Sequence, residues 1–190
     1  MKSRILNMLG YTAAEILIVT SIVAVVPLNV YIEAYKSAQG MSCLSNLRNI
    51  FVGVQMYEID NGRIPDIVFY PKNFDSDPKS IFNVLRYYVE DTKVYVCPVM
   101  PDELKKKKIT YIWNDNYNGK PMHFVDDRRS KWIMTEMTAV QPEIPPPHKG
   151  AYNVLFLDGH AESVKEAVYL YPTPADLIKD HGCEYAERAD

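Results

Sequence analysis

The N-terminal residue best suited to do chemistry is Glu15, a carboxylate within the apolar stretch from Ala13 to Val26. A charge placed in hydrocarbon costs about 2.5–3.5 kcal/mol even on the insertion scale. A cationic partner removes most of this cost, whereas an unpaired buried carboxylate keeps it. We therefore expect Glu15 to be functional. The alternative is an ordinary signal anchor that carries an accidental polar residue.

His148, Asp158 and His160 are of the types that bind metals or transfer protons. The chain between His148 and Asp158 spans about 30 Å when extended, so we expect the two to lie at opposite ends of one hairpin arm. A tethered metal-dependent hydrolase would require these side chains to converge. We predict no catalytic residue, no metal and no cofactor.

Glu15 must be positioned by a long helix, which we place at residues 11–61. Residues 11–32 are the expected transmembrane or filament-core part, because about 20 largely apolar residues are needed to span a bilayer. Pro27 lacks a backbone donor and clashes with the preceding turn, so we expect a kink or a locally open segment there.

Residues 33–61 are expected to form an amphipathic spine. Apolar side chains recur there at steps of three and four, the helical period, at Met41, Leu44, Leu47, Phe51 and Val54. The breaker pair Asn61-Gly62 predicts where the helix ends.

Residues 1–10, MKSRILNMLG, form a basic leader in which the small residue Gly10 precedes the apolar core. A secretory signal would place its small-residue exit after that core. The run from Gly10 through Glu15 into ILIVTSIVAVV resembles the class III signal of type IV pilins and type II secretion pseudopilins. The resemblance implies that a prepilin peptidase cuts Gly10–Tyr11 and methylates the new terminus. It also implies that Glu15 faces the N-terminal ammonium of a neighbouring subunit.

Three further features occur in order along the chain: the string CLSNLRNIFVGVQMYEIDNGRIP, the tripeptide Val96-Cys97-Pro98, and His148 followed after nine residues by Asp158-Gly159. Together they resemble the H-x9-DG branch of pseudopilin-like proteins. This resemblance implies a pilin-like α+β fold, with the long helix packed on a small antiparallel sheet.

Calcium-binding head loops occur in pseudopilin relatives, and Asp115, Asp126 and Asp127 offer suitable oxygens. No EF-hand-like spacing connects them, so we expect solvated loop acids. The basic run from Lys105 to Lys108 is expected to be a solvated hairpin tip rather than a phosphate site.

Residues 62–190 are predicted to form one globular α+β head. We expect a helix over residues 80–89 and strands over residues 94–97, 109–113, 131–137, 152–157 and 160–164, from their β-branched and aromatic content. Asp158-Gly159 predicts a two-residue type I′ turn between the last two strands. The segment from Pro142 to Gly150 is expected to be a loop across the head.

Export of the head follows from Lys2 and Arg4, which lie before the apolar segment and favour a cytoplasmic leader. The net charge of the chain is −3, and loss of these two residues with the leader makes it −5. An acidic balance gives no support to nucleic-acid binding as the main activity.

The three cysteines, Cys43, Cys97 and Cys183, include no C-x-x-C pair, which disfavours a zinc knuckle. An exported head makes a disulfide reasonable, and we expect Cys43 to pair with Cys97 and Cys183 to be a free thiol. The alternative is a set of buried free thiols in a reducing or anaerobic setting.

These features predict a non-enzymatic pilin or pseudopilin, inserted in the inner membrane as a precursor and then assembled into an extracellular or periplasmic filament. The expected partners are copies of itself, sister pilins, the prepilin peptidase, and an assembly ATPase with its inner-membrane platform. The alternative is a membrane-tethered module that binds a glycan or secreted substrate and does not polymerise.

Overall fold

The computed structural model describes residues 12–140 and 144–165, without the side chains of residues 22–29. Gly10, Tyr11, Cys183 and the leader lie outside the described residues. The helices are α1 (Ala13–Asn61), α2 (Ile81–Leu85) and α3 (Asp102–Lys105), and the strands are β1 (Tyr111–Trp113), β2 (Trp132–Glu136), β3 (Tyr152–Phe156) and β4 (Ala161–Val164). Short 3-10 helices are η1 (Thr92–Tyr95), η2 (Asp115–Tyr117), η3 (Met122–Phe124) and η4 (Met137–Val140).

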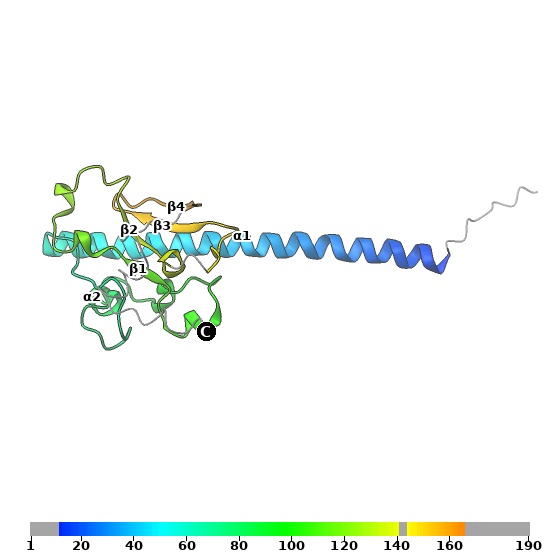
Figure 1. Cartoon of the computed structure of the whole chain (residues 1–190), viewed down its shortest axis with the longest axis horizontal. Helices are drawn as coiled ribbons and strands as arrows, with labels where there is room; N and C mark the ends of the chain where they lie inside the picture. Colours follow the sequence, from blue (N-terminus) through cyan, green and yellow to red (C-terminus); the bar gives the residue numbers. More distant parts are fainter. Residues whose placement is uncertain (1–11, 141–143, 166–190) are drawn as a thin grey trace, which may run out of the picture. The chain divides into compact units, whose positions relative to one another are not determined.

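The chain divides into two compact units, Met1–Ser37 and Ala38–Asp190. This boundary falls inside α1, the long helix drawn in Figure 1. α1 runs through Pro27 as one helix, so the locally open segment predicted there is not seen. A proline removes only one backbone donor, and the helical bonds of its neighbours continue. Within the residues that the structure describes, we find no helix with both the length and the apolar character to cross a membrane.

Both ends of α1 are explained by local chemistry. At the start, the Thr12 backbone N–H donates to Glu15 Oε2 over 2.7 Å, and the Glu15 N–H donates to Thr12 Oγ1 over 3.2 Å. This reciprocal pattern is a capping box. At the other end, Gly62 has φ +72° and its N–H donates to the Glu58 carbonyl over 2.7 Å. The predicted end at Asn61-Gly62 is confirmed, because glycine adopts the left-handed conformation after the last turn without strain.

The head is built on a four-stranded antiparallel sheet in the order β1-β2-β3-β4. Tyr111 of β1 lies opposite Glu136 of β2, and Tyr152 of β3 lies opposite Val164 of β4. Every residue of β3 is buried, whereas most of the edge strand β4 is at least partly exposed. The fold is therefore α+β, with a long N-terminal helix and a small antiparallel sheet.

The part of α1 within the head unit contributes one stripe of side chains to the core, formed by Cys43, Leu47, Ile50, Phe51 and Val54. Their steps of three and four are the helical period. The predicted stripe was wrong at its start, because Met41 is exposed and Leu44 is only partly buried.

Two predicted elements were wrong or too long. Residues 94–97 were expected to form a strand, but η1 occupies Thr92–Tyr95 because the Asp91 carboxylate accepts a hydrogen bond from Lys93 N–H and starts a 3-10 turn. The helix expected over residues 80–89 is limited to α2, which Ser80 caps by accepting from Asn83 N–H. The remaining strand predictions are confirmed with ends shifted by one or two residues.

The Asp158-Gly159 turn also differs from its prediction. A type I′ turn needs positive φ at both central residues. Asp158 does not have a positive φ, so this turn is not type I′. Gly159 alone has φ +92°, and its N–H donates to the Phe156 carbonyl over 2.9 Å. A Cβ at Gly159 would lie 2.5 Å from the Phe51 ring. Only glycine fits here, because the turn needs positive φ and packs directly on α1.

Candidate functional site

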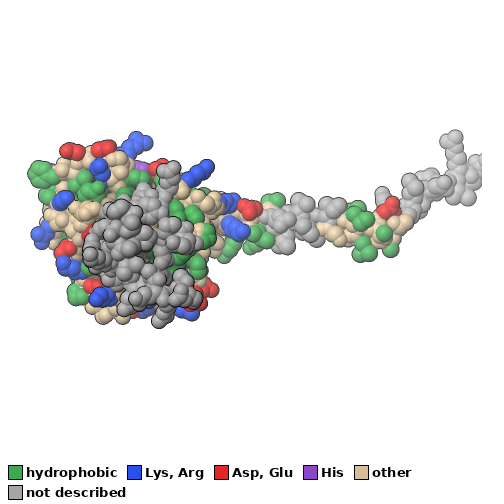
Figure 2. Space-filling view, in the orientation of Figure 1, with side chains coloured by type: hydrophobic (Ala, Val, Ile, Leu, Met, Phe, Trp, Pro, Cys, Tyr) green, Lys and Arg blue, Asp and Glu red, His purple; other side chains and the backbone are tan. Residues whose placement is uncertain are grey.

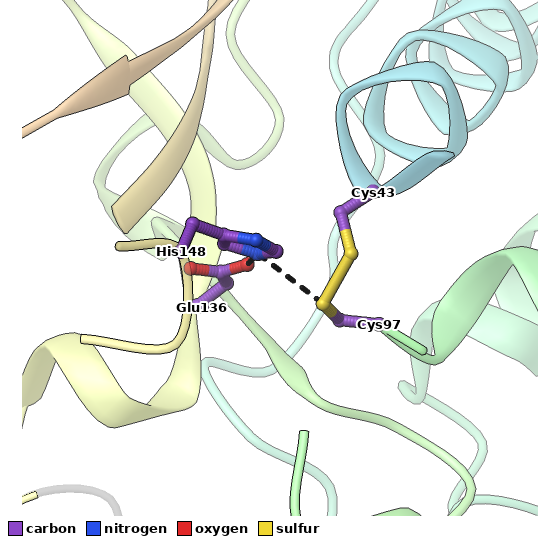
Figure 3. A group of neighbouring side chains, drawn as sticks. All are labelled: Cys43, Cys97, Glu136 and His148. Carbon is purple, nitrogen blue, oxygen red and sulfur yellow. Dashed lines mark hydrogen bonds and ion pairs between the residues drawn. A yellow bond between two sulfur atoms is a disulfide. The ribbon is translucent and has the colours of Figure 1, made fainter. Parts of the chain in front are cut away.

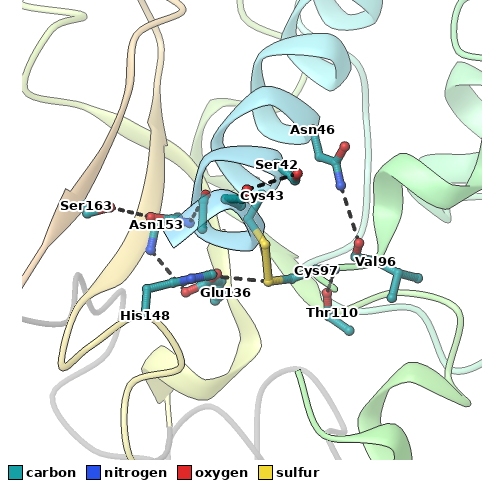
Figure 4. Close-up of a disulfide and its surroundings, with 12 residues drawn as sticks. Ser42, Cys43, Asn46, Val96, Cys97, Thr110, Glu136, His148, Asn153 and Ser163 are labelled. Carbon is teal, nitrogen blue, oxygen red and sulfur yellow. Dashed lines mark hydrogen bonds and ion pairs between the residues drawn. A yellow bond between two sulfur atoms is a disulfide. The ribbon is translucent and has the colours of Figure 1, made fainter. Parts of the chain in front are cut away.

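The candidate site is centred on a disulfide between Cys43 of α1 and Cys97, two residues after η1 (Figure 4). The two Cα atoms are 5.2 Å apart, and neither residue is exposed. The Cys97 N–H donates to Thr110 Oγ1 over 2.7 Å, which fixes the backbone at this cysteine. The bond joins the pair of cysteines chosen in the sequence analysis and ties α1 to a segment 54 residues away.

His148 and Glu136 lie beside this disulfide (Figure 3). His148 Nε2 contacts Glu136 Oε1 and is 3.3 Å from Cys97 Sγ. The side chain of His148 is 6% exposed and that of Glu136 is 0% exposed. One ring nitrogen therefore faces both a carboxylate oxygen and a sulfur inside the core.

A tight turn presents His148 to the core. His148 and Ala151 exchange two backbone hydrogen bonds, of 3.3 and 3.1 Å. The central residues Lys149 and Gly150 have φ +53° and +82°. Positive φ at both central positions is the pattern of a type I′ turn, which the sequence analysis had placed at Asp158-Gly159. Because β3 starts immediately after this turn, the turn fixes His148 relative to the sheet.

Glu136 ends β2 and is held from the neighbouring strand. Its Oε2 accepts a hydrogen bond of 3.0 Å from the Asn153 N–H of β3. The Asn153 side chain in turn donates to the Gly40 carbonyl over 3.4 Å and accepts from Ser163 Oγ over 2.5 Å. One asparagine thus connects β3, β4 and α1 around the carboxylate.

Burial is the main influence on the protonation of Glu136. It raises the pKa of the Glu136 carboxyl above its ordinary value, although His148 and the Asn153 N–H act in the opposite direction. Burial also raises the pKa of Tyr111, with a smaller contribution from the charge of Glu136. A buried carboxylate in this setting is costly without a positive partner, and the site therefore favours a proton or a cation next to Glu136.

The other chemistry-bearing residues are not brought to this site. Asp158 Oδ1 is 2.5 Å from His160 Nδ1 and accepts from the His160 N–H over 3.1 Å, in the turn after β3. His148 lies before β3, so the expectation that His148 and Asp158 lie at opposite ends of one strand is confirmed. Neither His160 nor Asp158 joins the buried group.

The loop acids do not converge with other metal-ligating side chains among the residues described. Within the described part of the chain, one group of metal-ligating side chains converges, and it consists of Cys43, Cys97, Glu136 and His148. Asp115, Asp126 and Asp127 are not part of this group. In the basic run, Lys105, Lys106 and Lys108 form ion pairs with carboxylates of the head.

Glu136 was not among the site residues predicted from the sequence. The signal was available in the strand predicted over residues 131–137, whose single carboxylate follows the apolar residues Ile133 and Met134. A charged residue in such a strand requires a partner, and a search for that partner leads to His148.

Comparison of the chain with protein-family models, curated proteins and solved structures gave no significant match.

Proposed function

We propose that the chain is a non-enzymatic subunit of a type IV pilus-like or type II secretion pseudopilus filament. In this proposal a prepilin peptidase cuts between Gly10 and Tyr11, and the subunits then assemble through their N-terminal helices. The sequence signal around Gly10 and Glu15 motivates the proposal. The α+β architecture with a long N-terminal helix is compatible with it.

One observation carries the proposal: apolar side chains on the N-terminal unit of α1 are exposed. Ile16, Leu17, Ile18 and Val19 each have more than half of their surface exposed, as do Val30 and Tyr31. Green hydrophobic side chains are visible on the described part of this unit in Figure 2. Burying each aliphatic side chain contributes about 1.5–3 kcal/mol. This surface therefore favours removal from water, in lipid before assembly and against other copies of the helix afterwards.

Glu15 has the acceptor capacity that the proposed pairing needs. Both hydrogen bonds from Thr12, of 2.7 and 3.0 Å, end on Glu15 Oε2. Within the described residues, no hydrogen bond to Oε1 is found. The capping bonds can thus persist while Oε1 accepts from the N-terminal ammonium of a neighbouring subunit. The Glu15 carboxylate can therefore cap its own helix and pair with the neighbouring subunit at the same time.

The capping box allows a test that separates charge from helix capping. Gln at the third helical position preserves the box, so Glu15→Gln removes the charge and keeps the cap. We expect Glu15→Gln to be processed normally, while the yield of sheared surface filaments falls more than about tenfold, because breaking a buried ion pair costs about 3–5 kcal/mol. Glu58→Gln, at the opposite end of α1, is the matched control and should assemble normally.

The outcomes distinguish the proposal from its alternative. Normal filament yield from Glu15→Gln would show that assembly does not need the charge of Glu15. Wild-type chain that stays in the membrane fraction, with none in the sheared fraction, would favour the tethered binding module instead.

A further inference from the structure

We infer that the head binds one zinc-like cation, when its disulfide is reduced, through Cys43, Cys97, Glu136 and His148. One donor atom from each of these residues lies within 4.8 Å of the other three. Thiolate, imidazole and carboxylate are the ligand types of tetrahedral Zn²⁺ sites. The inference does not depend on filament assembly, because all four residues belong to the head unit.

The orientation of the His148 ring favours a metal site over a proton relay. In a relay the two ring nitrogens would serve different partners. Here the same nitrogen, Nε2, faces both Glu136 Oε1 and Cys97 Sγ, which is 3.3 Å away. The imidazole, carboxylate and Cys97 sulfur donors therefore lie next to one another, as Figure 3 shows.

Ion binding requires reduction. Zn–S bonds of about 2.3 Å in a tetrahedral site place the two sulfurs about 3.8 Å apart, so Cys43 and Cys97 cannot remain bonded to each other. A dithiol reductant transfers two electrons and two protons to the disulfide, giving two thiols and the oxidised cyclic disulfide of the reductant. The cation then displaces one proton from each thiol. Oxidation of the two thiolates by a disulfide reverses the step and releases the ion.

Charge and burial define the kind of site. Two thiolates and the Glu136 carboxylate carry three negative charges, and a divalent ion cancels two of them. Cys43, Cys97 and Glu136 are completely buried, so four protein ligands leave no open position for substrate or water. This is the arrangement of a structural metal site, which would replace the disulfide as the link between α1 and the sheet.

The surroundings already orient the ligands, as outer contacts do in metal sites. The Asn153 N–H holds Glu136 Oε2 and leaves Oε1 directed at His148. The backbone of α1 lies close to the other ring nitrogen, because a Cβ at Gly40 would be 3.4 Å from His148 Nδ1. Little rearrangement beyond separation of the sulfurs is needed.

The test uses the full chain carrying Cys183→Ser, so that Cys43 and Cys97 are its only thiols. The protein is reduced with a phosphine, desalted without oxygen and titrated with Co²⁺, which reports thiolate ligands by a charge-transfer absorption band. We expect one Co²⁺ per reduced chain, displacement by equimolar Zn²⁺, and no band from the oxidised chain. Absence of the band from the reduced chain, or an equal band from the oxidised chain, would overturn the inference.

Variants separate a folded site from binding by unfolded thiols. Glu136→Gln should lower the Zn²⁺ affinity of the reduced chain more than about tenfold, since even outer contacts cost 10–100-fold. His148→Gln should have a similar effect, whereas His160→Gln, which alters a half-buried histidine outside the group of four, should not. Circular dichroism of the oxidised variants checks their folding. Unchanged affinity in both Glu136→Gln and His148→Gln would show that thiols alone bind the ion, contrary to the inference.

Discussion

The two parts of α1 differ in what surrounds them, although they belong to one helix. In the N-terminal unit, Leu17 is 66% exposed, and the described hydrogen bonds are local ones such as the Thr12–Glu15 cap. In the head unit, Leu47 is 0% exposed, and Cys43 joins the helix covalently to Cys97. Capping and helix propensity therefore support the first part, whereas burial and a cross-link hold the second.

This contrast assigns separate tasks to the two parts. A helix supported only locally is marginal in water, and most helices in proteins depend on packing of an apolar face. The exposed apolar side chains of the first part thus lack the packing that Leu47 and Phe51 have in the second. We expect the first part to gain it from lipid or from other subunits.

The largest expected effect is that of removing the disulfide. With Cys183→Ser as the reference, Cys43→Ala/Cys97→Ala should lower the free energy of unfolding of the head by about 4 kcal/mol, since the bond closes a loop of about 55 residues. Urea denaturation measures the difference. A loss below about 1 kcal/mol would mean that the cross-link is not what fastens α1 to the head.

A matched pair of leucine substitutions compares the two parts directly. Leu47→Ala should cost about 3 kcal/mol in the stability of the monomer, because it leaves a cavity in the core. Leu17→Ala should change it by less than about 0.5 kcal/mol, as exposed sites do, and should lower filament yield instead. Similar losses of monomer stability from both variants would contradict the contrast.

Two glycines with positive φ test the contact between the last turn and α1. Gly159→Ala should destabilise the head by about 2 kcal/mol, because its Cβ would strain the turn and collide with Phe51. Gly150→Ala should cost about 1 kcal/mol, since its Cβ meets nothing within 4 Å and only strain remains. If thermal denaturation showed equal losses of stability in the two variants, the contact between Gly159 and Phe51 would not contribute to stability.

The smallest expected effect lies at the start of α1. Thr12→Ala removes the capping hydroxyl and should destabilise the first turn by about 1 kcal/mol. Amide hydrogen exchange should accelerate near residue 15 and stay unchanged around Leu47. Acceleration in both places would show that the two parts of the helix unfold together.

The sequence predicted features that depend on neighbours along the chain. The helix end at Asn61-Gly62 and the strands containing Ile133 and Val154 follow from breakers and β-branched content, which act over a few residues. These predictions required no knowledge of how distant segments pack. The cysteine pairing was chosen on the export argument, with Cys43 on the predicted helix and Cys97 at the end of the strand predicted over residues 94–97, where the structure instead has η1.

Features that depend on distant contacts were missed. Glu136 and His148 are in contact because the fold brings β2 close to the turn before β3. No local sequence pattern predicts that contact. The two turns around β3 were misassigned because Lys149-Gly150 is a weaker type I′ signal than Asp158-Gly159. Contact with the Phe51 ring explains why a glycine is needed at position 159, and the local sequence does not predict that contact.

The most direct test of the filament account is mass spectrometry of the chain recovered from sheared surface filaments. The account predicts a mature protein that begins at an N-methylated Tyr11, with Glu15 four residues beyond the new terminus. A chain that retains its first ten residues within functional filaments, or that is found only as a monomer, would contradict it.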